Sequence, residues 1–256
     1  ADIHLLEAVT PSSQIMRFRS DVASACLWQI TYLASQDFAL RHGNIDASLE
    51  IIAVGRLATN SLTAQSDLDL IFVYDGQMDD VSDGAKPLGL SSYFIRLTQL
   101  ITSWMSLKTA HGRLYELDLR LRPDGNAGPL AISSERFSSY YDSEAWIWEF
   151  FALRDARTEL NGSPFSKHLS AKLEILRSQS FKPAELSSAF AAIQDRRKGE
   201  TYNFWNLKQR HGGLLDCSIA LYIIGNLDKE YPAISNRLNQ IQSRLEQLIQ
   251  QLSTRL

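Results

Sequence analysis

One run of the sequence, Ser66-Asp67-Leu68-Asp69-Leu70-Ile71-Phe72-Val73-Tyr74, places two acids at the start of an apolar strand. Successive side chains of a strand point to opposite faces, so Asp67 and Asp69 are predicted to share one face. The other face, directed to the core, carries Leu68, Leu70 and Phe72. Aspartate is disfavoured in strands, and two carboxylates so close together repel each other. The pair therefore has two interpretations: the acids are simply solvated at the start of a strand, or they bind a cation. Oxygen-rich sites of this kind suit Mg²⁺.

A second alternating run follows between Leu114 and Arg122. Its leucines are predicted to face the core, and its charged side chains to face the other way: Glu116, Asp118, Arg120 and Arg122. If this strand lies beside the first, Asp118 completes a three-carboxylate metal site, and Arg120 and Arg122 hold phosphate oxygens. The alternative is a one-sided sheet whose polar face is neutralised internally. Periodicity leaves both interpretations open.

The surrounding pattern predicts an α+β protein. We expect a helix from Ser12 or Ser13 through about the first forty residues, a strand over 51–54 ending at Gly55, strands over 68–74 and 114–121, and a helix between Ser91 and Gly112. After Pro129 helices are expected to dominate: two capped by Ser133 and Ser143, then helices near 167–178, 183–197 and 214–227. A final apolar stripe runs from Ile234 to Leu252, and we interpret it as bundle core in preference to a coiled coil. The predicted domains are 1–132, with a small mixed sheet, and 133–256, an α-helical bundle.

Composition excludes several classes of protein. The chain has 256 residues, a net charge of −3 and 45% hydrophobic residues, which is typical of a globular protein. It lacks the basic surplus of general nucleic-acid binders. No apolar run reaches the roughly 18–20 residues of a membrane span, and the first residues resemble no secretory signal. We therefore expect a cytoplasmic protein that binds neither nucleic acid nor membrane.

The acids and their surroundings resemble the nucleotidyltransferase superfamily, and more closely the glutamine synthetase adenylyltransferases. Four segments carry the resemblance: 55–70, which begins Gly55-Arg56-Leu57 and ends Ser66-Asp67-Leu68-Asp69-Leu70; 114–129, with Leu114-Tyr115-Glu116-Leu117-Asp118-Leu119-Arg120-Leu121-Arg122-Pro123; 144–157, with Glu144-Ala145-Trp146-Ile147-Trp148-Glu149; and a weaker one over 207–216. The Trp-x-Trp-Glu form is more similar to the C-terminal, AMP-adding half of these enzymes than to the AMP-removing half.

The sequence departs from the family pattern at several positions. Ala58 and Thr59 stand where the family has a glycine pair that lets the backbone approach phosphate. Phe150 stands in place of a histidine and Asp155 in place of an arginine. Three further acids of the helical segment are replaced by Asn206, Arg210 and Ser218.

The resemblance implies Mg²⁺-dependent transfer of AMP from ATP to a tyrosine of glutamine synthetase. Asp67, Asp69 and Asp118 would be the catalytic residues and hold two Mg²⁺ ions. The nucleotide would be bound by Thr59, Ser66, Arg120 and Arg122, and Lys208 and Asp216 would lie in the domain that closes over it. A PII-type signalling protein is implied as a further partner.

A degenerate module that binds nucleotide or protein without catalysis is the alternative, favoured by the missing glycines and opposed by the intact acids. A third hypothesis is a nucleotidyltransferase with a small-molecule or nucleic-acid acceptor, which is disfavoured because the chain has no surplus of basic residues.

Overall fold

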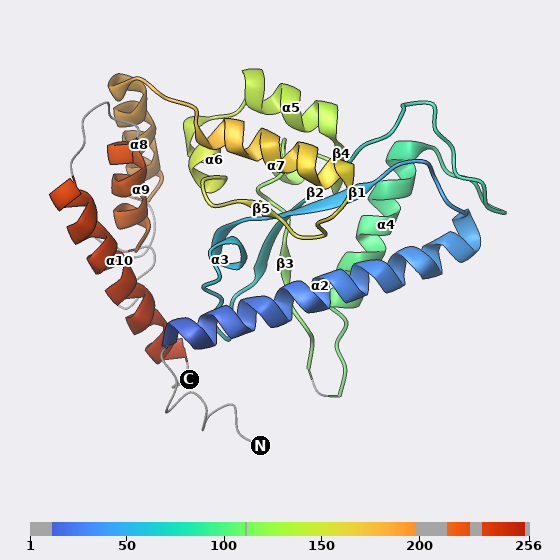
Figure 1. Cartoon of the computed structure of the whole chain (residues 1–256), viewed down its shortest axis with the longest axis horizontal. Coiled ribbons are helices and arrows are strands. Elements are labelled where there is room, and N and C mark those ends of the chain that lie inside the picture. The colour runs from blue at the N-terminus through green and yellow to red at the C-terminus, as the bar shows by residue number, and fades with distance from the viewer. Residues whose placement is uncertain (1–11, 111, 198–213, 226–231, 254–256) are drawn as a thin grey trace. The chain divides into compact units, whose positions relative to one another are not determined.

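The computed structural model describes residues 12–110, 112–197, 214–225 and 232–253 (Figure 1). The chain forms two compact units, one of residues 16–177 and one of residues 178–256 together with the first fifteen. The predicted domain boundary after residue 132 stays a prediction. The first compact unit extends beyond that point and includes three further helices, α5 (Ser134–Ser143), α6 (Ile147–Ala152) and α7 (Pro164–Arg177).

A five-stranded mixed sheet forms the centre of the first unit. Its strands are β1 (Leu49–Ala53), β2 (Leu68–Tyr74), β3 (Leu117–Asp118), β4 (Ala131–Ser133) and β5 (Arg157–Thr158). β2 is central: it runs antiparallel to β1 and parallel to both β3 and β4. β3 pairs with the first residues of β2 and β4 with the last, while β5 pairs with the other edge of β1. The start of β2 therefore lies beside β3.

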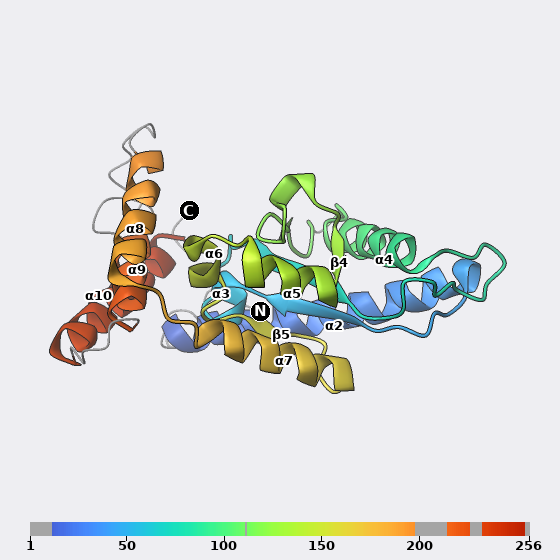
Figure 2. The same ribbon diagram turned by 90° about the horizontal axis from the view of Figure 1, so that it is seen from above.

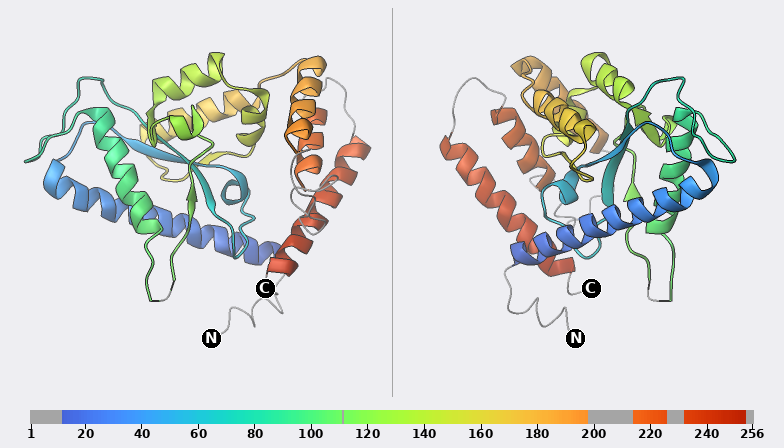
Figure 3. Two further views of the ribbon diagram at one scale, coloured as in Figure 1. Left: turned by 180° about the vertical axis from the view of Figure 1, so that it is seen from behind. Right: turned by 45° about the vertical axis from the view of Figure 1, so that its right-hand side comes forward.

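Helices cover both faces of this sheet (Figure 2). On one face, α2 (Ser12–His42) and α4 (Leu90–Met105) pack against β1 and β2, as Figure 3 also shows. As predicted, the shared core includes Leu68, Leu70 and Phe72, all fully buried. On the other face, α5 (Ser134–Ser143) packs against β2, and α7 (Pro164–Arg177) against β5. The remaining helices of this unit are short: α3 (Gly55–Ala58), η1 (Gly125–Ala127) and α6 (Ile147–Ala152).

The second unit is helical, as predicted for this part of the chain. Its described helices are α8 (Pro183–Arg197), α9 (Leu214–Gly225) and α10 (Pro232–Ser253), and α9 packs against α10. Along the predicted apolar stripe of α10, Ile234, Ile241 and Leu248 are exposed. Among the described helices of the whole chain, none is both long and apolar enough to cross a membrane.

The third strand is shorter than the sequence predicts. Alternation predicts a strand over 114–121, whereas β3 contains only Leu117 and Asp118. Beyond this pair the Asp118 side chain accepts the amide N–H of Arg120 at 2.9 Å, in place of a neighbouring strand. The amide of Arg122 then donates to the Leu119 carbonyl at 3.4 Å, which turns the chain out of the sheet. The predicted strand was therefore wrong at both ends: residues 114–116 lie outside β3, and over 119–121 local hydrogen bonds replace the ladder.

Candidate metal centre

The first two residues of β2 and β3 bring the three predicted acids together. Asp69 and Asp118 are register partners on parallel strands, and Asp67 directly precedes β2. An oxygen of each carboxylate lies within 4.8 Å of an oxygen of the other two. Asp67 is exposed, and the other two are half-buried. Converging carboxylate oxygens, one of them exposed to solvent, are donors that suit Mg²⁺.

Gly55 places the backbone directly against this cluster. Its φ of +57° lies in the left-handed region, and a Cβ built on it would lie 2.6 Å from Oδ2 of Asp69. The Val54 amide also donates to the Asp69 carbonyl at 3.0 Å. Glycine is therefore needed here both for the backbone conformation and for the close approach to the carboxylate.

Arg120 binds the third acid of the cluster. Its Nε lies 2.9 Å from both Oδ1 and Oδ2 of Asp118, and its Nη2 also donates to that carboxylate. The Arg120 side chain is 71% exposed and the Asp118 side chain 13% exposed. The hydrogen bonds to Asp118 and the charge of that carboxylate raise the pKa of Arg120, and the charges of Asp67 and Asp69 add to this. Arg120 thus lies in the field of the whole cluster.

Arg122 has other partners. It is 6% exposed, and its guanidinium donates to the carbonyl oxygens of Leu119 (2.5 Å), Gly128 (3.0 Å) and Pro129 (2.8 Å). Burial lowers its pKa, an effect that the charge of Asp118 opposes. Because the strand ends at Asp118, Arg122 does not share a face with Arg120 as the alternation predicts. It ties residues 119–129 into a closed loop beside the acids.

The cluster opens into a hollow of about 400 Å³. Its lining includes the predicted Asp67, Glu116, Asp118, Arg120 and Arg122, and also Thr102, Leu117, Leu119, Asn126 and Leu130. Sequence reasoning missed Thr102 and Asn126. Thr102 lies on α4, so no local pattern connects it to the acids. Asn126 follows a Pro and Gly turn signal after Arg122, which could have indicated a loop folding back toward the site.

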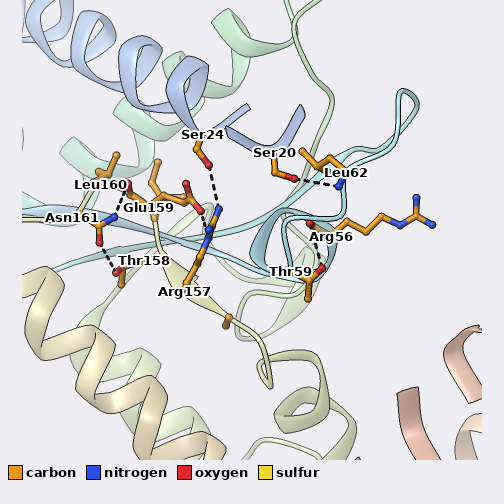
Figure 4. A network of polar contacts seen from close by, with 12 residues as sticks. Ser20, Ser24, Arg56, Thr59, Leu62, Arg157, Thr158, Glu159, Leu160 and Asn161 are labelled. Atoms are coloured by element: carbon orange, nitrogen blue, oxygen red, sulfur yellow. Dashed lines mark hydrogen bonds and ion pairs between the residues drawn. The ribbon is translucent and has the colours of Figure 1, made fainter. Parts of the chain in front are cut away.

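The two predicted hydroxyls lie in the turn that connects α3 to β2. Thr59 Oγ1 donates toward the carbonyls of Gly55 (3.2 Å) and Arg56 (3.4 Å) and lies 2.7 Å from Ser61 Oγ. Figure 4 shows the contact with Arg56. Ser66 Oγ accepts the Thr63 amide at 3.0 Å and Arg56 Nη1 at 3.3 Å. The turn is also fixed to α2, because the Leu62 amide donates to Ser20 Oγ at 3.2 Å. Both hydroxyls thus organise the turn itself.

The substituted glycine pair adopts conformations that any residue accepts. Ala58 belongs to α3, and Thr59 has φ −86°. We therefore expect Ala58→Gly and Thr59→Gly each to lower the free energy of unfolding by about 0.4–1 kcal/mol, because glycine increases the entropy of the unfolded chain. Chemical denaturation measures the change. Asn60→Gly is the matched control, since Asn60 has φ +54° and should tolerate or prefer glycine. An increase in stability for the first two variants would contradict this account of the turn.

The Trp-x-Trp-Glu segment forms a buried polar contact in the first unit. Glu149 is buried, and its carboxylate accepts the Tyr140 hydroxyl at 2.7 Å and the Trp146 amide at 2.8 Å. Phe150 packs edge-on against Tyr141 at 5.5 Å between ring centroids. Of the residues expected in the closing domain, Asp216 lies on α9, and Lys208 lies outside the described residues.

Comparison with known proteins extends the resemblance seen in the motifs. The model of a family described as glutamate-ammonia ligase adenylyltransferase matches residues 4–171, which include the whole acidic cluster. The chain belongs to this adenylyltransferase family.

Three relatives carry the name bifunctional glutamine synthetase adenylyltransferase/adenylyl-removing enzyme. The protein of Bradyrhizobium diazoefficiens is 36% identical over 225 residues, 86% of this chain and 22% of the relative. That of Mesorhizobium japonicum is 36% identical over 218 residues, which are 84% of this chain and 22% of the relative. That of Bartonella quintana is 38% identical over 185 residues, which are 71% of this chain and 19% of the relative. The chain thus spans about a fifth of the length of these adenylyltransferases.

Proposed function

We propose that this chain transfers AMP from Mg-ATP to a tyrosine hydroxyl of glutamine synthetase. The observation that carries the proposal is the convergence of Asp67, Asp69 and Asp118 in a member of the adenylyltransferase family, with Asp67 and Asp118 lining a hollow. The acceptor follows from the names of the relatives, which act on glutamine synthetase. The AMP-adding direction follows from the Trp-x-Trp-Glu segment. A PII-type partner and a cytoplasmic location stay predictions.

The residues present fit Mg²⁺. The donors are carboxylate oxygens, they lie within 4.8 Å of one another, and at least one of them is exposed to solvent, so water and phosphate can complete the coordination. We propose that Asp67, Asp69 and Asp118 together hold two ions. When bound, Mg²⁺ supplies positive charge at the phosphates and orients the attacking and leaving oxygens.

The side chains around the hollow have distinct tasks in this reaction. A bond forms between the tyrosine oxygen and the α-phosphorus of ATP, and the bond from that phosphorus to the oxygen of the β-phosphate breaks. Asp118 would accept the hydroxyl proton, and pyrophosphate leaves with the former bridging oxygen. Arg120 lines the hollow with a largely exposed guanidinium and can bind the departing phosphates.

A module that binds nucleotide without transferring it is the second candidate. One observation favours it: the Thr59 hydroxyl, at the position of a family glycine, is engaged with Gly55, Arg56 and Ser61 within its own turn. Such a turn offers the triphosphate fewer donors than a glycine pair does. The weakening expected from one lost charge-assisted contact is at least tenfold in ATP affinity.

Labelled nucleotide separates the two candidates. The full chain is incubated with purified glutamine synthetase, Mg²⁺ and ATP labelled either on the α- or on the γ-phosphate. We expect the α-label to appear on a tyrosine of glutamine synthetase and the γ-label in pyrophosphate, and chelation of Mg²⁺ should stop both. ATP binding in a titration with no label on the acceptor would overturn the proposal in favour of the binding module.

A further inference from the structure

The predicted phosphate-binding Arg120 uses the same oxygens that a cation would need. Nε of Arg120 lies 2.9 Å from each oxygen of Asp118, and the Arg120 amide donates to Oδ1, also at 2.9 Å. The carboxylate is thus bound by both the side chain and the backbone of one residue. Asp118 is 13% exposed, so its oxygens have few alternative partners in solvent.

A guanidinium and a divalent cation exclude each other at this carboxylate. Both are positively charged, and each binds best by direct contact with the carboxylate oxygens. The remaining acids of the cluster, Asp67 and Asp69, attract Arg120 as well, so the guanidinium is held near the cluster by more than Asp118. Rotation of the Arg120 side chain away from Asp118 costs little burial, since 71% of the side chain is already exposed.

Arg122 does not share this behaviour. It is buried and donates to three backbone carbonyls, so it stays with the loop when ligands arrive. Both arginines line the hollow, but Arg120 has a largely exposed side chain whose end phosphate oxygens can reach. A triphosphate therefore offers Arg120 a second anionic partner close to the first.

We propose that Arg120 competes with the divalent cation for Asp118, and that nucleotide phosphates relieve the competition by binding the guanidinium. The inference rests on the proposed function, because it requires a cation and a nucleotide in this hollow. Cation binding to the protein alone is then weak, and it strengthens when ATP binds. The third carboxylate becomes available for the cation, and for the hydroxyl proton, only when nucleotide is present.

The test measures binding of Mn²⁺, a spectroscopic substitute for Mg²⁺, to the full chain without nucleotide. We expect Arg120→Gln to tighten Mn²⁺ binding by about tenfold, because the variant removes both the ion pair and a nearby positive charge. The same variant should bind ATP in the presence of Mn²⁺ about tenfold more weakly than the wild-type chain. The exposed position of Arg120 makes a folding defect unexpected, and thermal melting checks this.

Two controls assign the effect to the ion pair. Arg113→Gln removes the same charge from the same segment, but Arg113 pairs with Glu116, and Mn²⁺ affinity should change less than about twofold. In the Asp118→Asn background, Arg120→Gln should change Mn²⁺ affinity far less than in the wild-type chain, because the competing pair is already absent.

The outcomes separate this inference from the proposed function. Unchanged Mn²⁺ affinity in Arg120→Gln overturns the competition, whether or not the chain labels glutamine synthetase. If Arg120→Gln binds Mn²⁺ more tightly but ATP with unchanged affinity, the proposal that phosphates draw Arg120 away from Asp118 is overturned. Tighter Mn²⁺ binding together with weaker ATP binding supports the inference even in a chain that transfers no AMP, and in that case only the proposed transfer activity fails.

Discussion

Asp69→Asn is expected to lower the rate of AMP transfer by about 10³-fold or more while leaving the protein folded. Asp69 lies at the centre of the cluster, with Asp118 as its register partner and Gly55 against its Oδ2. Cation stabilisation of charge in the transition state is worth several kcal/mol, and each 1.36 kcal/mol is a factor of about ten in rate. Cation-dependent ATP binding should weaken by at least tenfold at the same time.

Asp69→Asn should not lower the stability of the fold. Asparagine has nearly the shape of aspartate, and removing one of three converging charges relieves repulsion, so the melting temperature without cation should stay constant or rise. Asp79→Asn is the matched control, since Asp79 is exposed in the loop after β2 and lies outside the cluster. If Asp69→Asn instead unfolds the chain, the acids are structural, and the interpretation of a neutralised polar sheet face is correct.

The position of the cluster could be predicted because two strands carry a period-two pattern. The apolar residues 68, 70 and 72 indicate one buried face, and this face is buried in the structure. Once that face is assigned, Asp67 and Asp69 must point the other way. Register with a second strand then brings Asp118 within reach. Strong local periodicity and one strand pairing were sufficient for this part of the site.

The same reasoning failed just beyond Asp118 for a local reason. Alternation assumes that the strand continues, but a hydrogen bond from the Arg120 amide to the Asp118 carboxylate and a turn at Leu119 end it there. Pro123 and the glycines that follow are turn signals, and they could have indicated an earlier end. The close approach of Gly55 to Asp69 was not predictable in this way, since it depends on how α3 follows β1 and lies over β2.

The sequence also did not predict two short strands at the edges of the sheet, β4 and β5. β4 and β5 contain three and two residues, too few for a period to show in the sequence. They pair through contacts with β2 and β1, which are distant along the chain. The Ser133 cap of α5, in contrast, was predicted and is confirmed, because Ser133 Oγ accepts the Arg136 amide at 3.1 Å. The cap predicted at Ser143 was wrong: Ser143 is the last residue of α5, and Trp146 is the N-cap of α6.

Arg122→Met is expected to destabilise the first unit strongly, and far more than a change at the exposed Arg113 or Arg120. The change leaves the carbonyls of Leu119, Gly128 and Pro129 without their charged donor. A hydrogen bond to a charged group contributes about 1.5–3 kcal/mol, so a total loss of about 3 kcal/mol or more in the free energy of unfolding is expected. For a chain of this length, that lowers the melting temperature by roughly 6–12 °C.

This result distinguishes a structural arginine from a phosphate ligand. If Arg122 bound phosphate directly, the variant would melt normally and lose ATP affinity, as Arg120→Gln is expected to do. If it ties the loop of residues 119–129, stability falls first, and Arg122→Lys, which keeps the charge but not the planar fork, recovers only part of it. Arg113→Met, at an exposed ion pair on the same segment, should change stability by less than about 0.5 kcal/mol. Thermal melting and ATP titration on the same samples separate the two roles, because only a structural arginine links the two losses through unfolding.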